Sequence, residues 1–325
     1  MKKVLSVLLA AVLTLSVFAT TAFADEAKAV EPNGMKVTAL FFSLEGEFFQ
    51  MFDGLLREEL ESKGYEYESQ SSNLDPITMC EQIENAAISG TDLIWTWAVS
   101  GEAIADTCHR VREDYGVKIY SFVQYPGEGN VDVFRGTDET ECGHKIAEMA
   151  IDWADAKEYK EDGSIKALIL GNEDSTQQKE RFEAVQEKLA EDARFDILEA
   201  VTLEASTVAA QNTSENMFNK YDHIDCVITP AGEMALGVVA YTHSESSPVD
   251  FKDVAVFGTE LNEEIANYIK DGSIIGTIMN GGVPAENVKT QAEQIDKLLK
   301  GEEVEAFSGV DLSKVTIDNL EEFGY

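Results

Sequence analysis

The chain has few basic residues: 25 lysines and arginines stand against 61 acidic residues, which gives a formal net charge of −36. A surface with that charge repels nucleic acid and anionic lipid, so we expect no nucleic-acid partner. The 44% share of hydrophobic residues is ordinary for a globular protein. The charge therefore indicates a well-solvated folded protein rather than a disordered one.

The usual enzyme and metal motifs are also missing. The sequence contains no GxSxG, P-loop or HExxH motif, and no GxGxxG ahead of a helix. Its four cysteines form no CxxC pair, and its four histidines lie in no larger group of metal ligands. We therefore predict no catalytic residues, no metal site, no cofactor and no enzyme activity. A disulfide between Cys80 and Cys108, on consecutive predicted helices, is an alternative to buried free thiols.

Long hydrophobic runs are missing except at the N-terminus. There, Lys2-Lys3 precedes a mostly apolar stretch (4–18) and the small residues of Ala22-Phe23-Ala24, a pattern typical of a Sec signal peptide cut after Ala24. A membrane anchor is the alternative, but the apolar stretch is short for one. No cysteine precedes Cys80, so the lipid-anchoring cysteine of bacterial lipoproteins is missing. We expect a protein released to the periplasm, the cell envelope or the extracellular space.

Strand and helix patterns alternate along the rest of the chain. The strands are short apolar runs such as 37–43 and 93–97, and the segments between them repeat apolar residues at helical spacing. The alternation restarts after the polar segment 158–166. Apolar strands alternating with helices indicate parallel sheets covered on both faces, and the restart indicates two lobes. Such sheets bind ligands at the carboxyl ends of their strands, which two lobes would place across a cleft.

Aromatic and polar residues follow the predicted strands of the first half. Phe48 and Phe49 come after the first strand, and only one of them can point into the core. Trp97 lies near the end of another strand, and Gln124 and Tyr125 end the next one. Aromatic rings stack on the C–H faces of sugars, and amides bond hydroxyl groups without demanding charge. These five residues are therefore candidate ligand contacts, with solvated or core positions as the alternative.

The second half offers polar residues at the same kind of position. A helix begins near Ser175 and carries Gln177, Gln178, Lys179 and Arg181. Glu260 and Asn280 each end a predicted strand. The loop between residues 229 and 233, in contrast, contains only Pro230, Ala231 and Gly232 and has almost no side-chain chemistry.

The order of these segments resembles one known family, the type I periplasmic binding proteins of ABC importers, in particular the ribose- and galactose-binding branch. The resemblance runs from about Met35 to Asp311. It is carried by an ordered set of segments: EFF, GTDLIW, GTDETECGHKIAEMA, KERFEAV, GEMALGVVA, DGSIIGTIMN and LLKGEEV. The resemblance implies an α/β fold of two doubly wound parallel-sheet (Rossmann-like) lobes joined by three hinge strands.

The resemblance also implies how the chain divides. After the signal peptide (1–24), residues 35–137 plus 281–309 would form an N-terminal lobe, and 138–280 plus 310–325 a C-terminal lobe. The hinge strands would cross near residues 137–138, 279–280 and 309–311.

As a function, the resemblance implies an extracytoplasmic protein that closes on a small sugar or sugar-like ligand and delivers it to ABC permease subunits. Family members are mostly monomers. The family's ligand contacts map to Phe48 or Phe49, to Lys179, to Thr259 or Glu260, and to Asn280. The alternative function is presentation of a nucleoside-like or other ring compound to a chemoreceptor or a sensor kinase.

The sequence departs from the sugar-binding pattern at two places. Val123-Gln124 stands where these proteins often have Asp-Arg, and Ala231-Gly232 where they have Asn-Asp. Charged hydrogen bonds of that kind contribute about 1.5–3 kcal/mol each. We therefore expect a more aromatic ligand site, which suits a modified sugar, a nucleoside-like molecule or another ring compound as well as ribose or galactose.

Overall fold

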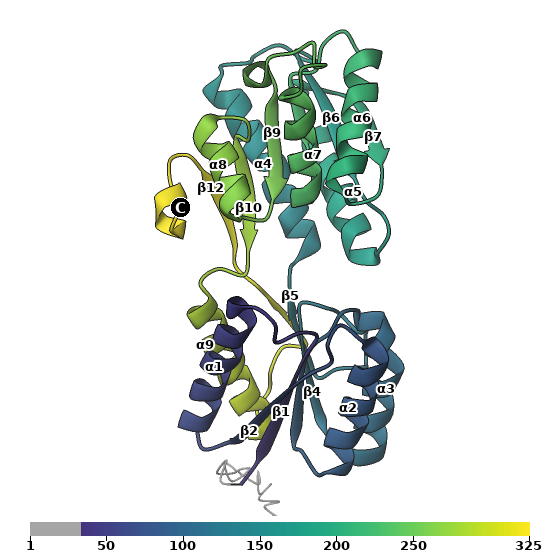
Figure 1. The fold of residues 1–325 in the computed structure, drawn as a ribbon, viewed down its shortest axis with the longest axis vertical. Coiled ribbons are helices and arrows are strands. Elements are labelled where there is room, and N and C mark those ends of the chain that lie inside the picture. Colours follow the sequence, from purple (N-terminus) through teal and green to yellow (C-terminus); the bar gives the residue numbers. More distant parts are fainter. Residues whose placement is uncertain (1–33) are drawn as a thin grey trace, which may run out of the picture.

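The molecule has two lobes, each built on a six-stranded sheet, and it is narrowest where the chain passes between them (Figure 1). The computed structural model describes residues 34–325, so the predicted signal peptide at 1–24 lies outside the described part. Within each sheet, all pairs of neighbouring strands are parallel except one edge pair in the second sheet. The predicted α/β class with two parallel-dominated sheets is confirmed.

The first lobe has the strand order β11-β5-β4-β3-β1-β2. Its strands are β1 (Lys36–Phe41), β2 (Glu66–Ser71), β3 (Leu93–Trp97), β4 (Lys118–Phe122), β5 (Val133–Gly136) and β11 (Phe307–Gly309). Helices α1 (Glu47–Ser62) and α9 (Pro284–Leu299) pack on one face, where they share a core with Ala39 and Phe41. Helices α2 (Pro76–Ile88) and α3 (Gly101–Tyr115) pack on the other, against Leu40. Alternate residues of β1 thus face opposite cores.

The second lobe has the strand order β12-β10-β9-β8-β6-β7, with β12 antiparallel to β10. Its strands are β6 (Ile165–Gly171), β7 (Phe195–Thr202), β8 (Cys226–Ile228), β9 (Ala255–Thr259), β10 (Gly276–Asn280) and β12 (Leu312–Thr316). Its helices are α4 (Glu139–Ala156), α5 (Thr176–Ala190), α6 (Thr207–Lys220), α7 (Gly232–Thr242) and α8 (Glu263–Asp271), with short 3-10 turns η1 (Phe251–Asp253) and η2 (Leu320–Phe323). Alternating residues of β6 pack against α4 and α5 on one face and against α6 and α7 on the other.

The chain passes between the two sheets at three places. It leaves the first sheet after β5, returns after β10, and leaves again between β11 and β12. The elements on either side of each passage belong to different sheets, so the last helix of the first lobe, α9, comes from a late part of the chain (Figure 1).

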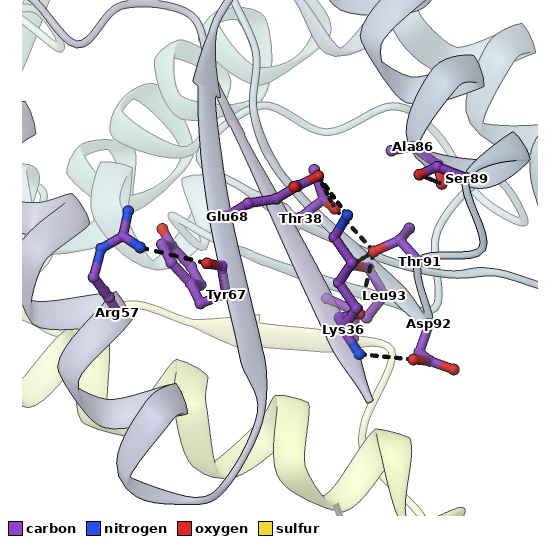
Figure 2. A network of polar contacts seen from close by, with 10 residues as sticks. All are labelled: Lys36, Thr38, Arg57, Tyr67, Glu68, Ala86, Ser89, Thr91, Asp92 and Leu93. Carbon is purple, nitrogen blue, oxygen red and sulfur yellow. Dashed lines mark hydrogen bonds and ion pairs between the residues drawn. The ribbon is translucent and has the colours of Figure 1, made fainter. Parts of the chain in front are cut away.

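Polar contacts tie the strands of the first sheet together at their amino ends (Figure 2). The backbone N–H of Lys36 donates to the Asp92 carboxylate at 2.7 Å, and the Thr91 hydroxyl donates to the Lys36 carbonyl at 3.1 Å. Buried Thr38 bonds both Thr91, at 2.9 Å, and Glu68, at 3.1 Å. The second sheet repeats the first of these contacts, because the N–H of Lys166 donates to Asp225. Ligands of parallel α/β sheets bind at the opposite, carboxyl ends of the strands.

Candidate ligand-binding site

A cavity of about 960 Å³ lies between the carboxyl ends of the two sheets. Its size falls in the range of small-molecule sites. The first lobe supplies mainly aromatic rings to it, and the second lobe supplies mainly polar groups. The residues that carry this division are, from the first lobe, Phe48, Phe52, Trp97, Phe122 and Gln124, and, from the second, Glu139, Ser175, Gln177, Gln178, Arg181, Glu260, Asn262 and Asn280.

The aromatic wall of the cavity consists of Phe48, Phe52, Trp97 and Phe122. Phe52 and Phe122 are buried and stack at 5.4 Å between ring centroids, and Trp97 packs edge-on against Phe122 at 4.9 Å. Phe48 lies at the start of α1, where 49% of its surface is exposed. Gly46 precedes this helix with φ of 95°, a conformation that favours glycine. The wall is therefore an extension of the core whose outer rings, Phe48 and Trp97, stay available to a ligand.

A strained turn brings Gln124 into the cavity. Val123 has φ of 67°, which is rare for a β-branched residue, and the N–H of Gln124 donates to the Phe122 carbonyl two residues back at 2.8 Å. The Ser121 hydroxyl donates to the Gln124 carbonyl at 2.7 Å and holds the turn. Tyr125 points elsewhere: its ring lies 4.8 Å from Phe134 and lines a smaller neighbouring cavity of about 310 Å³.

The polar wall is organised by Arg181 of α5. Its guanidinium donates to the Glu139 carboxylate, with both Nε and Nη2 2.6 Å from Oε2, and to the Pro230 carbonyl at 3.0 Å. Glu139 is only 7% exposed, and burial raises the pKa of its carboxyl while the nearby Arg181 opposes that rise. The loop that has no polar side chains, 230–232, thus contributes its backbone to the site instead.

Glu260 provides a second carboxylate on this wall, in another strained conformation. Its φ is 72°, its N–H donates to the Ile278 carbonyl at 2.7 Å, and its carbonyl accepts from the buried Thr277 hydroxyl at 2.5 Å. A Cβ at Gly232 would come 2.6 Å from Oε2 of Glu260, so a larger residue there would require the Glu260 side chain to shift. Burial and the neighbouring Glu233 raise the pKa of Glu260, and Arg181 opposes them. Backbone strain of this kind is concentrated at functional sites.

Arg135 connects the crossings beside the cavity. Its side chain is buried, and its Nε donates to the Asn287 side chain at 2.8 Å. Its Nη1 donates to Ser308 at 2.7 Å and to the Gly309 carbonyl at 2.9 Å. Asn287, which lines the cavity, in turn donates to the Gly281 carbonyl at 3.1 Å. One guanidinium therefore links β5, the crossing after β10 and the end of β11.

A family model described as "Periplasmic binding protein domain" matches residues 39–303. The chain belongs to this family. The match runs from β1 to α9 and so includes strands of both sheets, and the predicted resemblance is confirmed.

Named relatives of this periplasmic binding protein point the same way. The ribose import binding protein RbsB of Escherichia coli (strain K12) is 22% identical over 273 residues, which cover 84% of this chain and 88% of the relative. A crystal structure of the periplasmic ribose ABC transporter from Conexibacter woesei superimposes with a TM-score of 0.78 at 16% identity, covering 91% of this chain and 96% of that one. The Caulobacter myo-inositol binding protein, with myo-inositol bound, gives a TM-score of 0.67 at 19% identity and covers 89% and 95%. Structural likeness at these identities shows the fold.

The cavity brings together five of the eight residues predicted for the site. Phe48, Trp97, Gln124, Glu260 and Asn280 all line it. Their contact with a ligand stays a prediction, but their placement agrees with the argument that strand ends and the loops after them form the site.

Phe49, Tyr125 and Lys179 do not line this cavity. Phe49 packs behind the aromatic wall, 5.0 Å from Phe42 and 5.4 Å from Trp97 between ring centroids. Lys179 points to solvent, where it pairs with Glu173 and Glu183. Two residues along a helix turn the side chain about 200°, so Arg181 takes the cavity face of α5 in place of Lys179.

Sequence reasoning missed Glu139 and Asn287, which line the cavity beside the crossings. Glu139 reads as an ordinary first-turn acid of α4, and its role is visible only once α5 places Arg181 beside it. A buried acid paired with a distant arginine leaves no local pattern in the sequence.

Membrane-spanning helices, metal sites and disulfides are three further features that the described residues could contain. In residues 34–325, no helix is long and apolar enough to cross a membrane. The same residues contain no group of three histidine, cysteine, aspartate or glutamate side chains placed to hold a metal ion. All four cysteines are free thiols, so the alternative of a disulfide between Cys80 and Cys108 does not describe this structure.

Proposed function

We propose that this periplasmic binding protein is the extracytoplasmic solute-binding component of an ABC importer, and that its ligand is a small sugar or sugar-like molecule held in the cavity between the lobes. The observation that carries the proposal is the division of that cavity. An aromatic wall from the first lobe faces a polar wall from the second. A sugar ring has C–H faces that stack on aromatic rings and hydroxyl edges that need hydrogen-bond partners, which is the complement of this arrangement.

The names of the relatives support the same ligand class. The relatives that match over most of this chain are ribose import binding proteins. Structural neighbours include a solute binding protein with bound D-allose and one with bound myo-inositol. All of these ligands are small, ring-forming polyhydroxyl compounds, which agrees with the argument from the cavity walls.

We propose that the mechanism is closure of two bodies about the three crossings, with residues 35–137 plus 281–309 in one body and 138–280 plus 310–325 in the other. A ligand that touches both walls stabilises the closed arrangement by its differential affinity for it. The Arg135 contacts support this mechanism, because they keep the ends of the crossings together while the lobes move. Permease subunits would then receive the closed, loaded monomer.

The proposed location is the periplasm or the outside of the cell membrane, after Sec export and cleavage behind Ala24. The charge of −36 and the membership of the periplasmic binding protein family support it. N-terminal sequencing of the protein recovered from an extracytoplasmic fraction tests this, with Asp25 expected as the first residue.

The ligand proposal is tested by thermal unfolding and isothermal titration with a panel of pentoses, hexoses, inositols and nucleosides. We expect at least one sugar-like member to raise the unfolding temperature and to bind in a one-to-one ratio. Mass spectrometry of the recovered ligand should find it unchanged, because a binding protein releases what it binds. A panel in which nucleosides bind and every sugar and inositol fails would contradict the proposed ligand class.

A further inference from the structure

The charges that line the cavity do not balance. Its charged side chains are Glu139, Arg181 and Glu260. Arg181 is already engaged by Glu139 and the Pro230 carbonyl. Across residues 34–325, no lysine, arginine or histidine lies within ion-pair distance of Glu260. The cavity therefore carries one carboxylate without a cationic partner.

The other cation on α5 cannot supply that partner. Lys179 points away from the cavity and pairs with Glu173 and Glu183. Glu233, at the first turn of α7, adds a further negative charge whose field reaches Glu260. The surroundings of Glu260 thus contain Arg181, which is occupied, and two carboxylates, from Glu139 and Glu233.

The position of Glu260 is fixed by the backbone. Hydrogen bonds to Ile278 and from Thr277 hold its peptide groups in a left-handed conformation with φ of 72°. These contacts hold the backbone of Glu260 in a conformation that is costly for glutamate, and from this backbone its side chain lines the cavity. The backbone N–H of Gly232 lies close enough to lower the pKa of the Glu260 carboxyl.

The opposite wall has few groups that could satisfy this carboxylate. Phe48, Phe52 and Phe122 have no hydrogen-bond donors in their side chains. The side-chain donors on the first-lobe side of the cavity belong to Trp97, Gln124, Thr137 and Asn287, and Asn287 already donates to the Gly281 carbonyl. Closing the lobes removes water from Glu260, and a desolvated charge without a partner is costly. Aromatic ring faces, on the other hand, attract cations. Both walls thus favour a positive charge between them.

We propose that the ligand carries a cationic nitrogen that lies against Glu260 and is covered by the rings of Phe48 and Trp97. An amino sugar is the simplest molecule with this group and the hydroxyl edge that the polar wall fits. This inference rests on the proposed function, since it names the class of sugar-like ligand that the same cavity takes.

Matched ligands test the inference without any variant. D-Glucosamine, D-glucose and N-acetyl-D-glucosamine differ at one position in charge and bulk, and the galactose series gives a second set. We expect isothermal titration at pH 7 to show that the amine of at least one series binds at least tenfold tighter than its hydroxyl and N-acetyl counterparts. If the neutral members bind and the amines bind no tighter, the inference is wrong while the proposed function stands. If no member of either series and no other sugar or inositol binds, both are wrong.

The Glu260→Gln variant tests which residue recognises the charge. Glutamine keeps the size and hydrogen-bonding atoms of glutamate and removes its charge. We expect the affinity for the amine to fall at least tenfold and the affinity for the neutral counterpart to change less than threefold. Glu263→Gln, an exposed acid in the first turn of α8 that does not line the cavity, is the matched control and should leave both affinities unchanged. An amine preference that persists in Glu260→Gln would overturn the assignment to this residue.

Discussion

The two walls of the cavity are built in different ways, although corresponding strands follow the same spatial order in the two sheets that carry them. The aromatic wall continues the core of the first lobe, where Trp97 and Phe52 also contact buried Trp95. The polar wall is held by pairings instead, chiefly the contact of Arg181 with Glu139 and Pro230. Burial therefore specifies one wall, and specific hydrogen bonds specify the other. Substitutions should affect the walls differently.

The largest effect is expected from Arg181→Met, which breaks the polar wall. It leaves Glu139, 7% exposed, without its counter-charge. Removing one partner of a buried pair costs roughly 3–5 kcal/mol of unfolding free energy. Urea denaturation followed by circular dichroism measures this loss, and ligand binding should be lost with it.

Lys179→Met is the matched control for Arg181→Met. Lys179 lies on the same helix and also pairs with glutamates, but its pairs are exposed to solvent. Exposed pairs contribute about 0–1 kcal/mol, so this variant should unfold at nearly the wild-type urea concentration. Arg181→Met combined with Glu139→Gln should regain part of the lost stability. Equal losses in the two single variants would contradict the description of the polar wall as a buried, paired network.

A smaller effect is expected from Phe48→Ala, which removes the outer ring of the aromatic wall. Because the ring is half exposed, the free energy of unfolding should fall by no more than about 1 kcal/mol. Ligand affinity should fall roughly tenfold, since an aromatic contact contributes about 0.5–1.5 kcal/mol beyond its buried area. Calorimetric titration measures the affinity. Phe307→Ala, another exposed phenylalanine that does not line the main cavity, should bind like the wild type.

The aromatic wall was the more predictable of the two from the sequence. The apolar runs of β1 and β3 fix where those strands end, so Trp97 could be placed near the cavity, and Phe48 and Phe49 were both candidates beside it. Glu260 and Asn280 were placed in the same way, as residues that end strands. The spacing of apolar residues and the end of a strand are local properties, so they can be recognised in the sequence itself.

The pairings of the polar wall were not predictable in this way. Glu139 and Arg181 are 42 residues apart and come from different helices, so their contact depends on how α4 and α5 pack. The choice between Lys179 and Arg181 depends on the rotation of α5 about its axis, which a weakly amphipathic helix does not settle. The left-handed conformations of Val123 and Glu260 were also unexpected, because neither residue type favours them.

A pH-dependent effect is expected from Glu260→Gln. Burial and the Glu233 charge raise the pKa of Glu260 above its ordinary value of 4.5, against the opposing charge of Arg181. The folded protein therefore holds this proton more tightly than the unfolded chain does. The resulting stability is fully present below pH 4.5 and is lost as the pH rises through the raised pKa. Glutamine does not ionise, so the variant should gain stability relative to the wild type between pH 4 and pH 7.

Thermal unfolding of both proteins across that pH range measures the gain, with Glu263→Gln as the control on an exposed acid of the same region. A difference between Glu260→Gln and the wild type that is constant with pH would show that Glu260 binds protons alike in the folded and unfolded chains.

The smallest change in stability and affinity is expected from Trp97→Phe, which keeps a ring in the aromatic wall and removes only the indole. Ligand binding should alter the fluorescence of the wild-type protein chiefly through Trp97, because it is the tryptophan that lines the cavity. Trp95 is buried, and Trp153 is partly buried against the core of the second lobe. Trp97→Phe should therefore lose most of the ligand-induced signal while its affinity, measured by calorimetry, changes less than threefold. Trp153→Phe should keep the signal. If the Trp97→Phe variant kept the full signal, the fluorescence change would come from another tryptophan, such as Trp153 of the second lobe. The aromatic wall would then be core packing rather than a binding surface.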